Sequence, residues 1–156
     1  WNFLYGTHAT CLRFFTVYGP GQRPDMAIHL FAERILRGQP IPMFGDGSST
    51  RDYTYVTDIV KGVLSAVDRP MGYEVLNLGN SNTIRLDDLI QKIGKVVNIA
   101  PIINPMPEQP GDVPMTCADI SKAEKLLDYA PDFNLDEGLN KVLDWLQQKM
   151  DTAYKV

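Results

Sequence analysis

The chain has 156 residues, a formal net charge of −4, and 44% hydrophobic and 22% charged residues, the composition of an ordinary globular protein with one core. A general binder of nucleic acid or of anionic membranes would need a basic face, so the acidic balance argues against both. No apolar run reaches the length of a membrane span, and two cysteines and two histidines without paired spacing indicate neither a disulfide framework nor a metal site, which favours a cytoplasmic protein.

The first residues predict the end of a helix. Trp1–Tyr5 is followed by Gly6, and glycine commonly closes helices because it adopts positive φ without strain. A chain that starts with the last turn of a helix and without a methionine is expected to be a fragment of a longer protein.

An apolar and aromatic run comes next. Thr10–Tyr18 predicts a strand covered on both faces, and Gly19–Gly21 breaks the chain after it. Asp25 is then expected to cap a helix that ends at Gly38, and residues 41–44 predict a short strand. The apolar positions of this helix share one face: Ile28, Phe31, Ala32 and Ile35.

A loop with two glycines follows the short strand. Gly45–Ser49 permits positive φ and close approach of the backbone to a ligand, and Tyr53–Val56 alternates as a strand does. Arg51 lies between loop and strand, and its rigid fork of donors suits phosphate or carboxylate oxygens. The alternative is a salt bridge from this arginine to Asp46 or Asp52.

The rest of the chain alternates helices and strands. A helix begins at Thr57 or Asp58, Tyr73–Gly79 predicts a strand, and Ile102–Ile103 predicts a shorter one before a proline-rich connector. The last two helices open with capping pairs: Ser121 with Glu124, and Asn134 with Glu137. The three longest helices carry apolar stripes: Ile59, Val60, Val63, Leu64 and Val67; Leu86, Leu89, Ile90, Ile93 and Val97; Leu139, Val142, Leu143, Leu146 and Met150. Strands separated by helices indicate the α/β class.

Four blocks carry a resemblance to a known family. They are Leu12–Pro20, Arg23–Met26, Phe44–Tyr53 and Pro110–Val113. In this order they resemble the C-terminal part of the extended short-chain dehydrogenase/reductase family, which contains NAD-dependent nucleotide-sugar epimerases and dehydratases. The likeness covers essentially the whole chain, and the first two blocks look most like UDP-glucuronate 4-epimerases.

The resemblance implies a Rossmann-type α/β fold and a reaction in which bound NAD oxidises C4 of a UDP-sugar and returns the hydride to its opposite face. Family members carry a glycine-rich dinucleotide loop and a Tyr-x-x-x-Lys acid/base pair in an N-terminal Rossmann half. This chain has no GxxGxxG, and no such pair precedes its first strand. Residues 1–20 then correspond to the end of that half and 21–156 to the sugar-nucleotide-binding domain, so we expect the chain alone to be inactive and assign no catalytic residue.

The resemblance also implies binding residues. Arg51 matches an arginine that pairs with the nucleotide diphosphate, and Asp112 matches an aspartate that contacts the ribose, with an ordinary turn residue as the alternative. Phe44, with the backbone of Pro42 and Met43, matches the strand that binds uracil, and a buried core phenylalanine is the alternative there.

Weaker matches extend the predicted site. Tyr53 flanks the nucleotide or packs across its strand, and Thr16 stands where many relatives carry an asparagine beside the diphosphate. Gln109 replaces a second phosphate arginine of several galactose-type epimerases, which suits a uronate substrate. Arg23 is expected to bind the C6 carboxylate of glucuronate, with Asp25 as its alternative partner.

The resemblance extends to the cofactor and to partners. Phe14 and Tyr18 would face the nicotinamide of NAD in a complete protein, although a core position suits Phe14 better. The predicted ligand is a UDP-sugar, UDP-glucuronate or UDP-galacturonate, and the full-length enzyme is expected to be a homodimer. The alternatives are a UDP-glucose 4-epimerase, a UDP-glucuronate decarboxylase, a sugar-nucleotide dehydratase, or a stand-alone nucleotide-sugar-binding module. Leu12–Val17 is expected to leave an open sheet edge through which the isolated chain self-associates.

Overall fold

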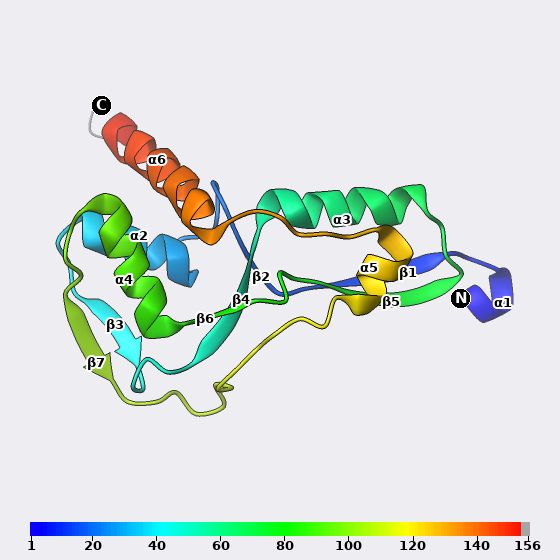
Figure 1. The fold of residues 1–156 in the computed structure, drawn as a ribbon, viewed down its shortest axis with the longest axis horizontal. Coiled ribbons are helices and arrows are strands. Elements are labelled where there is room, and N and C mark those ends of the chain that lie inside the picture. Colours follow the sequence, from blue (N-terminus) through cyan, green and yellow to red (C-terminus); the bar gives the residue numbers. More distant parts are fainter. Residues whose placement is uncertain (154–156) are drawn as a thin grey trace. The chain divides into compact units, whose positions relative to one another are not determined.

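The computed structural model describes residues 1–153, which form two compact units (Figure 1). The first unit consists of Trp1–Val17, Asp52–Thr83 and Thr116–Phe133. The second unit consists of Tyr18–Arg51, Ile84–Met115 and the chain from Asn134 onward. Neither unit is continuous in sequence, so residues that build one core come from three separate segments.

The first unit contains a parallel βαβ arrangement. β1 (Ala9–Phe14) and β5 (Tyr73–Leu78) pair in parallel over six residue pairs, and α3 (Val56–Asp68) lies in the connection between them. α3 packs against β1, while α5 (Ser121–Leu127) packs against β5 and α3. The mixed α/β fold with parallel strands that the sequence predicts is therefore confirmed.

The core of the first unit lies between these helices and the two strands. α1 (Asn2–Tyr5) precedes them and ends, as predicted, at Gly6, whose φ of 65° is left-handed. Gly62 brings α3 close to its neighbours, because a Cβ there would lie 2.8 Å from a methyl group of Leu78. The most buried apolar side chains come from the second and third segments of the unit, and Leu12, Phe15 and Val17 of the first segment pack against them. These buried side chains are Leu76, Leu78, Ala118, Ala123, Leu127 and Tyr129.

The second unit combines three helices with a small sheet. α2 (Ala27–Leu36), α4 (Leu86–Val97) and α6 (Leu135–Ala153) pack against one another. β3 (Ile41–Phe44) and β7 (Ile103–Met106) pair in parallel over four residue pairs. Most residues of the predicted apolar faces are buried, whereas Leu86, Val97 and Met150 are only partly buried. The buried ones are Ile28, Phe31, Ala32, Ile35, Leu89, Ile90, Ile93, Leu139, Val142, Leu143 and Leu146.

A third sheet has the strand order β2-β4-β6. Its strands are β2 (Thr16–Tyr18), β4 (Thr50–Tyr55) and β6 (Thr83–Arg85), and the chain passes from one unit to the other within each of them. The predicted boundary at residue 20 divides the chain by function and stays a prediction, whereas the compact units interleave along the sequence.

The prediction of one strand over Thr10–Tyr18, covered on both faces, is wrong. β1 ends at Phe14 and β2 begins at Thr16, and Cys11, Arg13 and Phe14 are exposed. Three of the six side chains of β1 are therefore exposed, and the unbroken apolar pattern does not correspond to two covered faces.

Two helix starts also differ from the prediction. The residue preceding α2 is Met26 rather than Asp25, and α3 begins at Val56, one or two residues early. Before α5, Ser121 donates its backbone and hydroxyl hydrogens to Asp119 instead of capping the helix. Asp25 and Ser121 each form a local contact elsewhere, with Arg23 and Asp119, since short polar residues also stabilise turns. Asn134, which precedes α6, does accept the backbone N–H of Asp136 at 2.8 Å, as predicted for a helix cap.

The predicted apolar stripe of α3 is only partly buried. Ile59 lies in the core, but Val60, Leu64 and Val67 are 49%, 58% and 71% exposed. Periodicity therefore predicted the helix correctly and the burial of its face incorrectly. Among the helices of residues 1–153, none has the length and apolar character needed to cross a membrane.

Candidate functional site

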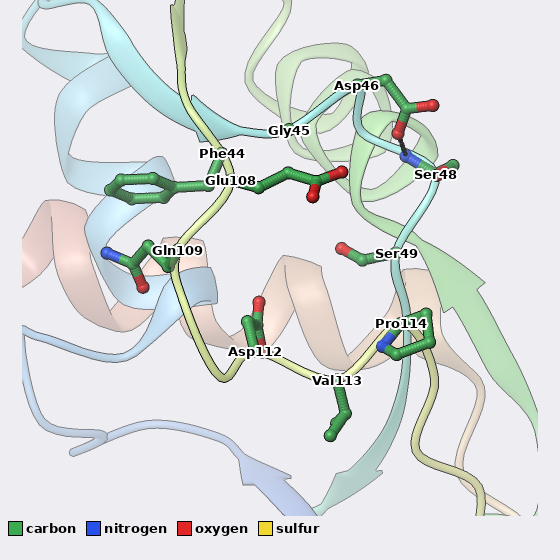
Figure 2. Close-up of a pocket in the computed structure, with 10 residues that line it drawn as sticks. All are labelled: Phe44, Gly45, Asp46, Ser48, Ser49, Glu108, Gln109, Asp112, Val113 and Pro114. Atoms are coloured by element: carbon green, nitrogen blue, oxygen red, sulfur yellow. Dashed lines mark hydrogen bonds between the residues drawn. The ribbon is translucent and has the colours of Figure 1, made fainter.

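A cavity of about 330 Å³ lies within the second unit, between the loop after β3 and the segment after β7 (Figure 2). Figure 2 shows the carboxylates of Glu108 and Asp112 and the hydroxyl of Ser49 pointing into the space between these two chain segments. Ten residues line it: Phe44, Gly45, Asp46, Ser48, Ser49, Glu108, Gln109, Asp112, Val113 and Pro114.

The loop after β3 is held close to α4. Gly45 and Gly47 have φ of 67° and 81°, and a Cβ on Gly47 would lie 3.0 Å from both Met43 and Asp87. The backbone N–H of Asp87 donates to the Gly47 carbonyl at 3.1 Å. The positive φ that the sequence predicts for this loop is therefore confirmed. The close approach that the structure shows is to Met43 and to Asp87 of α4, and the predicted approach to a ligand stays a prediction.

Asp46 stabilises the same turn. Its carboxylate accepts the backbone N–H of Ser48 at 2.8 Å, which Figure 2 marks with a dashed line. Hydrogen bonds from the Ser48 side chain and then its backbone hold the pKa of Asp46 below its ordinary value of 3.8. The group is therefore ionised at neutral pH and adds a negative charge to the rim of the cavity.

The opposite wall is a proline-glycine turn. The backbone N–H of Asp112 donates to the Gln109 carbonyl at 3.1 Å, with Pro110 and Gly111 between them, and Gly111 has a φ of 86°. Proline and then a positive-φ glycine suit the two central positions of a type II turn. The turn exposes the Asp112 side chain on the cavity side.

Backbone contacts bring this turn to β4. The N–H of Thr50 donates to the Pro114 carbonyl at 2.9 Å, and Thr50 and Met115 form a parallel bridge. The side chain after Thr50 is that of Arg51, so the strand delivers a guanidinium to the wall that carries Asp112.

Arg51 and Asp112 form an ion pair although they are 61 residues apart. Arg51 Nη2 lies 2.5 Å from Asp112 Oδ1, and the two side chains are 21% and 51% exposed. Arg51 Nη1 donates to the Thr50 carbonyl at 2.8 Å. Two residues predicted to bind one ligand thus come together, and this pairing replaces the predicted alternative of Asp46 or Asp52.

Other predicted site residues divide between the two units. In the second unit, Phe44 and Gln109 line the cavity, and Pro42 and Met43 precede Phe44 on β3, where both are partly buried. In the first unit, Tyr53 is buried and Thr16 is partly buried. Neither of these two lines the cavity.

Arg23 adopts its predicted alternative pairing. Its Nη2 lies 3.1 Å from Asp25, and the Arg23 side chain is 74% exposed. The loop that carries it is anchored by buried His29, whose Nδ1 lies 2.7 Å from the Gln22 carbonyl. Arg23 is not among the residues that line the cavity.

The two residues expected to face a nicotinamide have different surroundings. Phe14 is exposed at the end of β1 in the first unit. Tyr18 is buried in the second unit, where a Cβ on Gly138 would overlap its hydroxyl and ring. Within residues 1–153 no three His, Cys, Asp or Glu side chains gather into a group that could hold a metal ion.

The sequence prediction missed the roles of two residues: it did not name Glu108, and it named Asp52 only as an alternative partner of Arg51. Glu108 lines the cavity, and its position beside the Pro110–Val113 block was the available signal. Asp52 is fully buried in the first unit. Its carboxylate accepts hydrogen bonds of 2.8–3.1 Å from three backbone N–H groups and a hydroxyl, those of Asn80, Ser81, Ala118 and Thr54.

Comparisons with known proteins agree on one family. The model of the NAD dependent epimerase/dehydratase family matches residues 1–79. The UDP-glucuronate 4-epimerase of Thermodesulfobacterium geofontis is 38% identical over 152 residues, which are 97% of this chain and 47% of that protein.

Solved structures give the same picture. The UDP-glucuronic acid 4-epimerase of Bacillus cereus, in complex with UDP-glucuronic acid and NAD, matches 95% of this chain and 48% of its own with a TM-score of 0.89 and 37% identity. The UDP-glucose 4-epimerase of Thermotoga maritima with UDP-glucose matches 96% of this chain and 49% of its own, with a TM-score of 0.88 and 32% identity. The chain spans about half the length of the relatives that it matches.

Proposed function

The chain belongs to the NAD dependent epimerase/dehydratase family, and we propose that it is the sugar-nucleotide-binding part of an NAD-dependent UDP-glucuronate 4-epimerase. The complete enzyme would interconvert UDP-glucuronate and UDP-galacturonate and would act as a homodimer. The similarity to a UDP-glucuronate 4-epimerase over 97% of the chain supports the reaction class.

One observation carries the assignment of the site. Arg51 and Asp112, which the family resemblance links to the diphosphate and the ribose, form an ion pair. Asp112 lines a cavity that Phe44 also lines, and Arg51 reaches that cavity only through Asp112, since it is not itself among the lining residues. A guanidinium is suited to a diphosphate, a carboxylate to a vicinal diol, and an aromatic ring to a nucleobase. These three chemistries are those that a UDP moiety requires.

The roles of this chain's residues in the reaction follow from that site. Bound NAD would accept the hydride of the sugar's C4 carbon and return it to the other face. Arg51 would hold the diphosphate throughout, so that the sugar can turn about its link to the nucleotide without leaving the enzyme. Asp112 and Phe44 would fix the uridine, and Arg23 would orient the sugar by its C6 carboxylate.

The residues present fit only a small part of NAD. The chain has no glycine-rich dinucleotide loop, and such a loop with the following helix N-terminus is what holds the pyrophosphate in Rossmann folds. Phe14 is exposed and available to the nicotinamide end, whereas Tyr18 is enclosed by its own unit. We therefore propose that the chain alone neither binds NAD tightly nor catalyses epimerisation.

The binding proposal is tested by titrating this chain with UDP in a calorimeter. Arg51→Ala should weaken UDP and UDP-glucuronate alike by about thirtyfold or more, because loss of one partner of a desolvated charge pair costs roughly 2–5 kcal/mol. Arg37→Ala is the matched control, since Arg37 also forms an ion pair, with Glu33 on α2, but neither of these two residues lines the cavity. Equal UDP affinity in wild type and Arg51→Ala would refute the site.

A UDP-glucose 4-epimerase is the second candidate, since the Thermotoga maritima enzyme is also similar and Arg23 pairs with Asp25 here. Arg23→Ala separates the two. If Arg23 binds the C6 carboxylate of a uronate, the variant should bind UDP-glucuronate about tenfold more weakly, which is the value of a charge-assisted hydrogen bond. Its affinity for UDP and for UDP-glucose should not change. Equal wild-type affinity for both sugars, unchanged in the variant, would favour the glucose enzyme.

A further inference from the structure

The two proposed nucleotide-binding residues neutralise each other. Arg51 Nη2 and Asp112 Oδ1 are 2.5 Å apart, and backbone contacts fix both partners: Arg51 follows Thr50, whose N–H is bonded to Pro114, while Asp112 closes the turn that starts at Gln109. The ion pair is therefore held by backbone contacts on both sides, and its Asp112 partner lines the cavity whereas Arg51 does not.

A ligand cannot use these groups without separating them. A diphosphate oxygen that binds Arg51 takes the place of the Asp112 carboxylate, and a hydroxyl that donates to Asp112 takes the place of the guanidinium. A ligand with both groups restores a partner to each charge. A ligand with only one leaves the other charge partly desolvated and unpaired, which is costly.

The rest of the lining increases this penalty for a bare anion. Asp46 and Glu108 also border the cavity, and the pKa of Asp46 is held low by Ser48. When Arg51 turns to an anion, Asp112 becomes a further uncompensated carboxylate beside them. Like charges in one site raise the free energy of the ionised state.

We propose that the Arg51–Asp112 ion pair makes this site selective for a nucleoside diphosphate over either half of that ligand, a pyrophosphate or a nucleoside. The inference rests on the proposed function, because it takes the nucleotide to bind at this cavity. It adds that the contact of Arg51 with the diphosphate and the contact of Asp112 with the ribose depend on each other, because both require the ion pair to separate.

The test uses this 156-residue chain, with inorganic pyrophosphate, uridine and UDP as probes in calorimetric titrations. Asp112→Asn should bind pyrophosphate about two- to fivefold more tightly, since Arg51 no longer leaves a carboxylate behind and an exposed ion pair has that value. The same variant should bind UDP about fivefold more weakly, because a neutral amide is a poorer acceptor for the ribose. Arg51→Gln should show the mirror pattern, with tighter uridine and weaker UDP.

Glu108→Gln is the control for removing one charge from the cavity, and it should shift pyrophosphate and UDP in the same direction. If Asp112→Asn weakens both ligands, Asp112 only holds Arg51 in place and the exchange is refuted. Suppose that UDP binding depends on Arg51, but neither Asp112→Asn nor Arg51→Gln changes the affinity for UDP and for the half-ligand in opposite directions. The proposed exchange is then refuted and the proposed function stands. If the wild type binds no UDP, both fail.

Discussion

The two units differ in how completely they bury their own apolar side chains. In the second unit, most residues of the predicted apolar faces of α2, α4 and α6 are buried, and one cavity is lined entirely by residues of that unit. In the first unit, the side chain of Phe14 at the end of β1 is exposed. Three apolar side chains of α3 are exposed as well: Val60, Leu64 and Val67. Parallel sheets are normally covered on both faces. The proposed binding site lies in the unit that buries more of its predicted apolar side chains.

Asp52→Ala tests whether the first unit depends on one buried carboxylate. Three backbone N–H groups would lose their acceptor, and at roughly 1–3 kcal/mol each the loss is on the order of 5 kcal/mol. Amide exchange should accelerate in β5 and in residues 116–133 while α4 stays protected. Asp132→Ala, which changes an exposed aspartate of the same unit, is the control. Equal loss of protection in α4 would show that the two units unfold together.

The same substitution in each unit sharpens the comparison. Leu89→Ala removes a fully buried side chain of α4 and should lower the free energy of unfolding by about 2–5 kcal/mol. Leu64→Ala on exposed α3 should change it by less than about 0.5 kcal/mol. Urea denaturation followed by circular dichroism measures both. A large loss in Leu64→Ala would mean that the α3 face is covered in solution, by a second copy of the chain if sedimentation shows a dimer.

Gly138→Ala tests the packing of the second unit, because here we expect a substitution that usually stabilises a helix to destabilise the protein. Alanine usually stabilises a helix interior by about 1 kcal/mol relative to glycine. At this position a Cβ would overlap the buried Tyr18 ring, so we expect a net loss of about 1–3 kcal/mol. Gly138→Ala combined with Tyr18→Phe should recover part of it, because the hydroxyl is one of the overlapping atoms. A stabilised single variant would contradict the arrangement of Tyr18.

The smallest effects concern acid titration, and one exposed aspartate in each unit allows a matched test. Hydrogen bonds from Ser48 lower the pKa of Asp46, and hydrogen bonds from Ser121 lower the pKa of Asp119, both from an ordinary value of 3.8. A lowered folded-state pKa contributes stability above pH 3.8 that disappears as pH falls through the folded pKa. The urea midpoint should therefore fall slightly below pH 4.

Side-chain NMR separates these two contributions. Ser48→Ala should raise the pKa of Asp46 toward 3.8 and leave that of Asp119 unchanged, and Ser121→Ala should do the reverse, because in each pair the serine side chain is the largest cause of the shift. A shift of both aspartates in either variant would indicate a change of fold rather than the loss of one hydrogen bond.

Local patterns predicted the elements well and their surroundings less well. The apolar face of α2 and the glycine turn at residues 45–49 depend on neighbours within a few positions, and both were confirmed. The stripe of α3 obeys the same period, but three of its five residues are exposed. Periodicity states which side chains share a face, and it contains no information about whether another element covers that face.

The candidate site shows the same limit. The family blocks identified Arg51 and Asp112 as separate candidates. Pro110 followed by Gly111 predicts a turn from the sequence alone. The buried role of Asp52 gave no comparable signal, because the Thr54 hydroxyl is its one local donor among those described. Its three backbone donors lie 28, 29 and 66 residues away.

The sequence by itself determined the α/β class, the helix faces and the family, since these depend on local spacing and on blocks of adjacent residues. Only the tertiary structure decided that Arg51 and Asp112 meet across 61 residues at 2.5 Å, that the chain divides into interleaved units, and that α3 keeps an exposed face. The physical reason is the same in each case. Contacts between distant segments are set by which surfaces pack together, and that choice is made by the whole folded chain rather than by any stretch of it.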